Sequence, residues 1–253
     1  MIPRTNFTRK AFFGNLRVFS ACDRQEKEAL PLPYLAGGIM TKPKQGEMKR
    51  SVGLDLADEC EDRLRSRGIF ILDGDEVNTL ESGLFYRELL FLVSNGWPKG
   101  EPIWVILNSP GGHASQCFAI CDTIRSFIRE GYTINIFCLG HVASAATIIL
   151  QTATRRYSAP NTRFLVHQVR QQHVFLEEEV SQGEERVAEM VRINAQACAI
   201  IADRVGMDLQ DLLAKVKKTD LWLNAEEALK FGKNGLIDEI CPAFPFLDVL
   251  KRP

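Results

Sequence analysis

Three polar residues, each beside an apolar stretch, have the side chains needed for nucleophilic catalysis. They are Ser144, His167 and Asp220. In acyl-transfer enzymes a serine attacks the substrate, a histidine takes its proton, and an aspartate orients the histidine. Hydrolysis of an acyl bond is therefore one hypothesis. It requires a fold that brings together three positions lying far apart in the sequence.

Ser144 is expected at the junction between a strand and a helix. An apolar run predicts a strand over 132–140, Gly140 permits a sharp turn at its end, and 142–153 predicts a helix. Ser144 would then lie in the first helical turn, where unpaired N–H groups and the helix dipole favour developing negative charge. This is the arrangement of a nucleophile elbow. The same small residues are typical of close helix packing, so the motif alone leaves both interpretations open.

A serine nucleophile needs a base and a group that orients the base. The chain has four histidines: His113, His141, His167 and His173. His167 ends the apolar run 162–168, at the strand edge where sites form in parallel sheets, although a hydrogen-bonded core histidine fits the same pattern. Asp220 could hold the histidine tautomer, or it could form a turn. Asn224, with Glu227 three residues later, is the better helix cap, which leaves Asp220 free.

A glycine turn follows another apolar run, 102–108. In "NSPGG", Pro110 fixes one dihedral angle, while Gly111 and Gly112 allow conformations and close approaches that a side chain would forbid. Such a turn can direct backbone N–H groups into a cleft. An ordinary tight turn has the same composition.

The elements that must position these residues alternate along the chain. Strands are predicted at 68–74, 102–108, 132–140, 162–168 and 235–240, and helices at 82–96, 113–131, 142–153, 176–205 and 209–216. This alternation indicates an α/β fold with parallel strands buried on both faces. We interpret 1–66, rich in Pro, Gly and charge towards its end, as an N-terminal extension, 67–240 as the domain and 241–253 as a tail. The tail could dock on a neighbouring subunit or strap its own domain.

Composition favours a globular protein and excludes several classes of partner. Among 253 residues 45% are hydrophobic, and 31 basic residues against 32 acidic ones give a net charge of -1. This balance favours neither nucleic acid nor an anionic membrane. The most apolar region, 134–150, is too short and interrupted to span a membrane. Seven scattered cysteines, without a CxxC pair, indicate reduced and mostly buried thiols in a reducing compartment rather than a metal site.

The N-terminal segment has a composition found in targeting signals. The first 21 residues contain four basic residues and no acidic one. This pattern is typical of an organellar transit peptide, and a basic arm that docks onto another subunit would look the same. We expect a cytoplasmic protein, or one of an organellar matrix or stroma if this segment is a transit peptide.

Taken together, the motifs resemble those of the proteolytic subunit family of the Clp protease, within the Clp/crotonase superfamily. The resemblance runs from about Gly68 to Ile240. It rests on "NSPGG", "GHVASAA", "NTRFLVHQ" and "DLWLNAEEALKFG", in the family's order, with Ser144 and His167 separated by 23 positions and His167 and Asp220 by 53. The fold implied is one of repeated β-α units with a protruding helical handle.

The resemblance also implies a role for each site residue. Ser144 would be the nucleophile, His167 the general base and then acid, and Asp220 the group that orients His167. The backbone N–H groups of Gly112 and Ala145 would form the oxyanion hole. The implied reaction is cleavage of unfolded polypeptides by a serine endopeptidase.

The family further implies an assembly. Its members form heptameric rings, homo- or hetero-oligomeric, that stack as a tetradecamer, and an AAA+ unfoldase feeds unfolded protein substrates into the chamber. The chain itself would need no cofactor, because ATP is used only by the partner unfoldase. In keeping with this, the sequence has no GxxxxGK[ST] motif.

Two departures from the family pattern leave alternatives open. Ala145 and Ala146 stand where the family commonly has Met-Gly, and 167–179 lacks the usual proline and glycines of the segment that lines the substrate groove and helps join the rings. A non-proteolytic ring subunit with a misaligned triad is one alternative. A peptidase of the phage-head-maturation type, which often has alanines after the serine, is another. The superfamily's acyl-CoA chemistry is a third, although it needs no Ser-His-Asp set.

Overall fold

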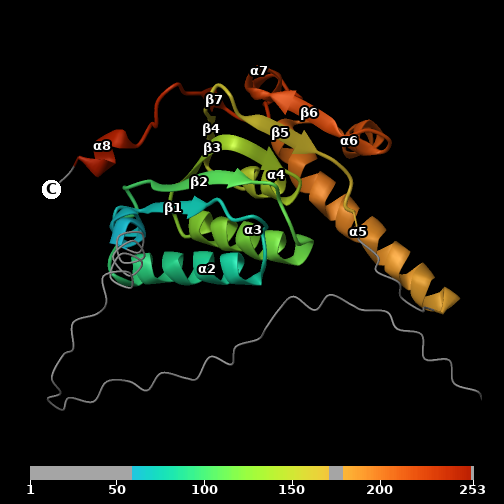
Figure 1. Ribbon diagram of the computed structural model, residues 1–253, viewed down its shortest axis with the longest axis horizontal. Helices are drawn as coiled ribbons and strands as arrows, with labels where there is room; N and C mark the ends of the chain where they lie inside the picture. The colour runs from blue at the N-terminus through green and yellow to red at the C-terminus, as the bar shows by residue number, and fades with distance from the viewer. Residues whose placement is uncertain (1–58, 171–178, 252–253) are drawn as a thin grey trace, which may run out of the picture. The chain divides into compact units, whose positions relative to one another are not determined.

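The protein is an α/β domain built on one seven-stranded sheet (Figure 1). The structure, a computed structural model, describes residues 59–170 and 179–251. The strands are β1 (Ile69–Leu72), β2 (Ile103–Ser109), β3 (Ile134–Ala143), β4 (Arg155–Ser158), β5 (Arg163–Val166), β6 (Leu221–Asn224) and β7 (Glu239–Ile240). The helices are α2 (Thr79–Ser94), α3 (Ala114–Arg129), α4 (Ala145–Leu150), α5 (Val180–Val205), α6 (Leu209–Val216), α7 (Ala225–Leu229) and α8 (Leu247–Leu250). The expected fold class is confirmed.

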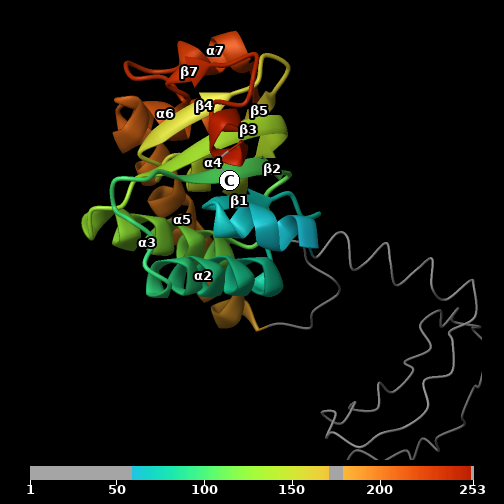
Figure 2. The same cartoon turned by 90° about the vertical axis from the view of Figure 1, so that its left-hand side faces the viewer.

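The sheet divides at its longest strand. Its main path runs β1-β2-β3-β4-β7, all pairs being parallel, as Figure 2 shows from the end of the sheet. The first half of β3, at 135–138, pairs with β4, whereas its last residues, 141–143, pair with β5. Strand β6 then adds to β5 in the antiparallel direction. The carboxyl end of β3 therefore belongs to a second branch of the sheet, which consists of β5 and β6.

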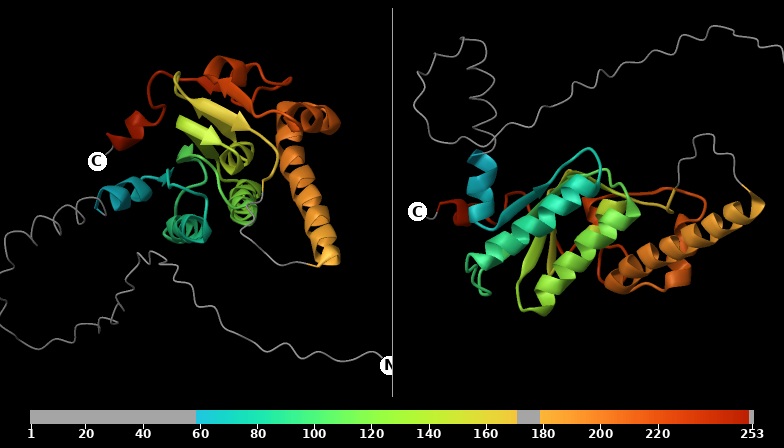
Figure 3. Two further views of the ribbon diagram at one scale, coloured as in Figure 1. Left: turned by 45° about the vertical axis from the view of Figure 1, so that its right-hand side comes forward. Right: turned by 90° about the horizontal axis from the view of Figure 1, so that it is seen from below.

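Alternation along the strands sends side chains to two different apolar clusters. Phe70 and Val105 point into the larger cluster, with the helices, whereas their neighbours Ile69 and Trp104 point to the opposite face. Helices α2 and α3 lie side by side over the first face (Figure 3). On the second face Phe246, which is 3% exposed, fills the cluster. The C-terminal tail is thus a strap on its own domain.

Local sequence explains where several helices begin. Asn78 accepts hydrogen bonds from two N–H groups of the first turn of α2, so this helix starts three residues earlier than the apolar pattern predicts. Asn224 and Glu227 form the expected capping box of α7. Helix α5 is 26 residues long and extends beyond the domain as the predicted handle (Figures 1 and 3). Among the described helices, none is long and apolar enough to cross a membrane.

Three local predictions were wrong or incomplete. Strand β3 does not end at Gly140 but continues to Ala143, and Gly140 instead allows a bend beside Asn108, whose Oδ1 accepts from the N–H of His141. Helix α4 is shorter than the stretch predicted for it. Strands β4 and β6 were not predicted, and β6 directly follows Asp220.

Part of the predicted extension packs on the domain. Residues 59–66 are helical, and Arg65 Nε lies 3.0 Å from Glu88 Oε1 on α2. At the end of this segment, Arg67 donates to the carbonyl of Val249 in the C-terminal strap, at 2.9 Å. The remainder of the extension, 1–58, lies outside the described residues.

Candidate active site

Ser144 lies on a strained turn between β3 and α4. Its φ of 54° and ψ of -121° make it the one non-glycine residue with positive φ in the described ranges. Such a conformation costs on the order of 1–3 kcal/mol and persists where the surrounding structure enforces it. Ser144 is the N-cap of α4 rather than a residue of its first turn, and its side chain caps no N–H group. The hydroxyl is thereby left available at the top of the elbow.

The glycine turn packs directly against this elbow. Both glycines have positive φ, 97° for Gly111 and 154° for Gly112. A β-carbon on Gly111 would lie 2.8 Å from the backbone nitrogen of Ala145 and still closer to Ser144. The predicted need for bare backbone is therefore confirmed. Gly112 is equally constrained, because a β-carbon there would lie 2.5 Å from the backbone nitrogen and oxygen of Val77, whereas the contact with the elbow itself falls on Gly111.

Hydrogen bonds fix the turn while leaving the proposed oxyanion donors free. The carbonyl of Gly111 accepts from the N–H of Val77 at 2.7 Å, and the N–H of His113 donates to the carbonyl of Val77 at 2.9 Å. The peptides on both sides of Gly112 are therefore held by a β-bridge to Val77. Within the described ranges, no acceptor takes the N–H of Gly112 or of Ala145. Two unpaired N–H groups therefore flank Ser144.

Strand pairing brings the other two predicted residues to the same edge. Ala143 is opposite Leu165 on β5, and the N–H of Ser144 donates to the Leu165 carbonyl at 2.8 Å. His167 is two residues further along this chain, just past the end of β5. The β5–β6 register ends with Val166 opposite Leu221, so His167 and Asp220 are the next facing pair. The strand pairing therefore brings Ser144, His167 and Asp220 to the same edge of the sheet, at most two residue positions apart along the paired strands.

The side chains do not form the hydrogen bonds of a triad. His167 Nδ1 lies 2.5 Å from the carbonyl oxygen of Gln168, and because a carbonyl only accepts, the proton of this contact belongs to Nδ1. The carboxylate of Asp220 forms an ion pair with Arg170. The sequence motifs gave no sign of this arginine's role. The structure therefore gathers the three positions but engages two of the side chains elsewhere.

The other described histidines have different surroundings. His113 Nε2 is 3.6 Å from Glu76 Oε1, and the ring of His141 stacks on Trp222 with 5.6 Å between centroids. Within the described ranges, neither imidazole has a hydrogen bond to Ser144 or to Asp220. His173 lies outside the described residues. This distribution supports His167 as the candidate base.

A buried thiol supports the helix that follows Ser144. Cys117 on α3 donates through Sγ to the carbonyl of Ala145, at 3.3 Å, and its sulfur is 4.0 Å from that of Cys121. The hydrogen bond with Cys121 and burial together raise the pKa of Cys117 well above its ordinary range. The thiol therefore stays protonated and acts as a packing group and donor. The prediction of mostly buried thiols is confirmed for the cysteines in the described ranges.

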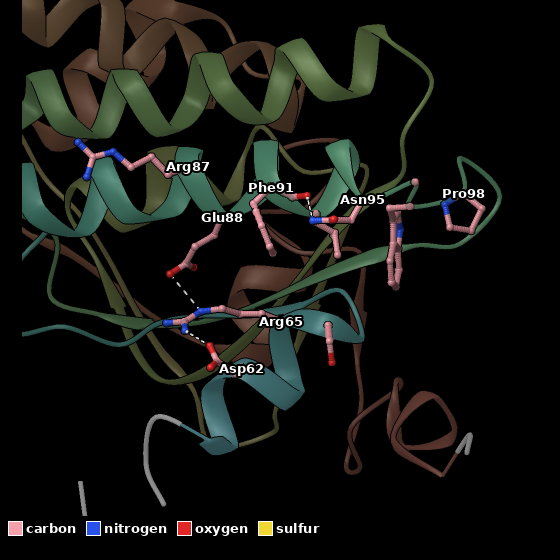
Figure 4. A pocket seen from close by; sticks show the side chains of 11 residues that line it. Asp62, Arg65, Arg87, Glu88, Phe91, Asn95 and Pro98 are labelled. Carbon is pink, nitrogen blue, oxygen red and sulfur yellow. Dashed lines mark hydrogen bonds and ion pairs between the residues drawn. The ribbon is translucent and has the colours of Figure 1, made fainter. Parts of the chain in front are cut away.

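A hollow lies elsewhere in the domain. A cavity of about 850 Å³ opens between the helix at 59–66 and α2 (Figure 4). Among the lining residues, Arg65 forms ion pairs with Glu88 and Asp62, and the exposed ring of Phe91 forms part of the wall. None of the three candidate catalytic residues lines it. The sequence motifs gave no indication of this pocket.

Comparison with known proteins identifies the family. The sequence profile of the Clp protease family matches residues 53–243. The chain belongs to the Clp protease family. The matched region contains both halves of the serine elbow, the glycine turn and the β5–β6 edge.

Individual relatives in the Clp protease family agree. The chain is 35% identical over 164 residues to the ATP-dependent Clp protease proteolytic subunit 2 of Treponema denticola, covering 64% of this chain and 78% of the relative. It is 32% identical over 196 residues to the protein of the same name from Pseudomonas aeruginosa, covering 77% and 92%. The protein of that name from Chlamydia trachomatis is 28% identical over 172 residues, with 67% and 79% covered.

Proposed function

We propose that this Clp family chain is a serine endopeptidase subunit that cleaves unfolded polypeptides. The observation that carries the proposal is the strained backbone of Ser144, whose positive φ is matched by close contact with Gly111. A serine that only helps a helix to pack has no need of this conformation. The unpaired N–H groups and the facing positions of His167 and Asp220 support the same conclusion.

The reaction follows from these positions. Ser144 Oγ attacks the carbonyl carbon of the peptide, and His167 takes its proton. The N–H groups of Gly112 and Ala145 stabilise the oxyanion, and His167 then protonates the leaving amine. Water attacks the acyl-enzyme by the same route. Asp220 orients and stabilises the imidazolium, which requires His167 to turn from Gln168 and Asp220 to leave Arg170.

The proposal includes a ring assembly. Two helices expose large apolar side chains, a feature that marks interaction surfaces. On α5 these are Val180, Val187 and Val191, and on α2 they are Leu80, Leu84, Tyr86, Leu90 and Phe91. The valines recur at spacings of seven and four, so they share one face of the handle. We assign these faces to contacts between subunits of stacked heptameric rings.

The remaining elements of the proposal concern partners and place. An AAA+ unfoldase delivers unfolded protein and hydrolyses the ATP, and this chain holds no cofactor of its own. The names of the relatives, which describe proteolytic subunits of an ATP-dependent protease, support this division of labour. We place the assembly in the cytoplasm. If the basic N-terminus is a transit peptide, the place is instead an organellar matrix or stroma.

One observation favours a second function, that of a weakly active or structural ring subunit. The ion pair between Asp220 and Arg170 keeps the carboxylate from His167. If this arrangement persisted in the assembled rings, the chain would serve assembly with a more active partner subunit.

Hydrolysis by the purified assembly tests the proposal. Wild type and Ser144→Ala are compared on a fluorogenic peptide and on casein, with and without an unfoldase and ATP. We expect peptide cleavage by wild type alone and casein cleavage that depends on the unfoldase. The variant should lose at least about 10⁴-fold in kcat, because the oxyanion donors contribute only a residual rate. Equal rates in the two proteins would reject Ser144 as nucleophile.

A further inference from the structure

Arg170 occupies the carboxylate that the candidate triad requires. Its guanidinium donates to Asp220 Oδ1. The side chain of Asp220 is 35% exposed and that of Arg170 is 65% exposed, so the pair lies at the rim of the site and not in the core. Such a pair is readily exchanged for another partner, because exposed ion pairs contribute little net stability.

The position of Arg170 makes it a direct competitor of His167. Both residues belong to the segment that continues past β5, and Val166, the last residue of that strand, faces Leu221. Asp220 directly precedes β6, and the same register places it opposite His167. An arginine side chain three residues further on reaches back to the same carboxylate, where it takes the place of the imidazole.

His167 is held in a matching alternative position. Its Nδ1–H, which a triad directs to the aspartate, donates to the carbonyl of Gln168 instead. The next peptide is also anchored, because Val169 N–H donates to Asn194 Oδ1 on α5 at 3.0 Å. The segment is therefore fixed at three successive points, and the bonds of His167 and of Arg170 each favour the separated arrangement of His167 and Asp220.

We propose that Arg170 is a positioning residue that competes with His167 for Asp220 and holds the site in a low-activity state. This inference rests on the proposed function, in which Asp220 serves His167. Activation exchanges one partner of the carboxylate for another: the Arg170 pair opens, His167 rotates from the Gln168 carbonyl, and Nδ1–H donates to Asp220. No covalent bond changes in this exchange.

The first test uses the full-length assembled protein and a fluorophosphonate probe that reacts with activated serines. Arg170→Gln keeps most of the side-chain length but removes the charge. We expect Ser144 to be labelled about two- to fivefold faster in this variant, the range over which an exposed ion pair shifts an equilibrium. Rising salt should speed labelling of wild type by screening the pair and should have little effect on Arg170→Gln. Slower labelling of the variant would overturn the proposal.

We call the Arg170–Asp220 ion pair, which withholds the carboxylate from His167, the latch. A matched control separates the effect of losing the latch from that of a general loss of charge. Arg63 is also an exposed arginine in an ion pair, with Glu59 at 2.8 Å, and lies on the helix at 59–66. Arg63→Gln should label at the wild-type rate and retain its salt dependence. The same acceleration in Arg63→Gln as in Arg170→Gln would count against the latch.

A structural readout distinguishes failure of the latch from failure of the proposed function. Cryo-electron microscopy of the Arg170→Gln assembly should show Asp220 facing His167 Nδ1. If that pair forms but Ser144 is not labelled in any variant, the competition stands and the peptidase proposal fails. If wild type is labelled while Asp220 in Arg170→Gln remains turned from His167, the peptidase proposal stands and the latch is wrong.

Discussion

Gly111 and Ser144 are in such close contact that a β-carbon on the glycine would lie 2.7 Å from Cβ of the serine. The turn after β2 and the elbow after β3 are therefore shaped by each other. Both residues have positive φ, and their neighbours carry the two unpaired N–H groups of the site. One contact thus sets the spacing between the nucleophile and the groups proposed to hold the oxyanion.

Substituting Gly111 by alanine should therefore damage catalysis. The new methyl group would also lie 2.6 Å from the carbonyl oxygen of Ala143, a backbone atom that cannot move away alone. We expect kcat to fall at least about tenfold, and the free energy of unfolding to fall by about 1–3 kcal/mol from the strain. Peptide hydrolysis and urea unfolding measure the two effects.

Gly96 provides the matched control for this substitution. Its φ is 87°, but a β-carbon there would meet no atom within 4 Å. Gly96→Ala should share the backbone strain, with a cost of about 1 kcal/mol, and keep full activity. An equal loss of activity in both variants would show that the contact with Ser144 is not the cause.

The buried ion pair between Arg156 and Asp238 should make a large contribution to stability. Arg156 is 1% exposed, lies 2.5 Å from Asp238 Oδ1 and also donates to Gln151 at 2.6 Å. Arg156→Met leaves the carboxylate without its main partner and should lower the free energy of unfolding by about 3 kcal/mol. The neighbouring Arg155, which is half exposed, is the control, and Arg155→Met should cost less than about 1 kcal/mol. Chemical unfolding of the two variants decides the matter, and equal costs would contradict the assignment.

The same pair predicts how stability depends on pH. Burial alone would raise the pKa of Asp238, but the hydrogen bonds and charge of Arg156 outweigh it and hold the pKa below its ordinary value. The stabilisation is complete above the pKa of an unfolded aspartate, about 3.9, and is lost as the pH falls through the folded-state pKa. The stability gap between wild type and Asp238→Asn should thus narrow below about pH 4. Urea unfolding from pH 6 to pH 3 tests this, and a constant gap would refute it.

The exposed valines of the handle should control assembly. Val191 is 63% exposed, so Val191→Asp should leave the fold of the subunit intact while placing a charge in the proposed contact. We expect smaller particles in sedimentation velocity. Gln210→Asp, which adds the same charge to an exposed position of α6, should leave the particle size unchanged. An undiminished assembly in Val191→Asp would remove the handle from the proposed interface.

The sequence predicted elements where one signal dominates. The capping box of α7 and the long amphipathic α5 could be recognised because the determinants are local. Strand β4 was missed because it is four residues long and contains Arg156, whose buried position depends on Asp238, 82 positions away. Strand β6 was missed because Trp222 remains exposed and the strand gains its place only by pairing with β5. Pairings between distant segments leave little local signal.

The candidate site shows the same division. Motif order brought out Ser144, His167 and Asp220, and the register of the sheet then placed them at one edge. The elbow at Ser144 was predicted from the motif, but its close packing against the turn at Gly111 was not, because that contact joins two segments far apart in the sequence. The partner of Asp220 was missed as well, since an arginine in a polar segment is usually solvated. Competition between side chains for one carboxylate can be recognised only when the backbone positions are known.

Mapping the residue that a fluorophosphonate probe modifies tests the central claim most directly. The assembled full-length protein is treated with the probe, digested and analysed by mass spectrometry, together with Ser144→Ala and His167→Ala. Our account predicts a single covalent adduct on Ser144 in wild type, and its loss in both variants, because the serine reacts only when His167 takes its proton. An adduct on another residue, or labelling of Ser144 that is undiminished in His167→Ala, would contradict it.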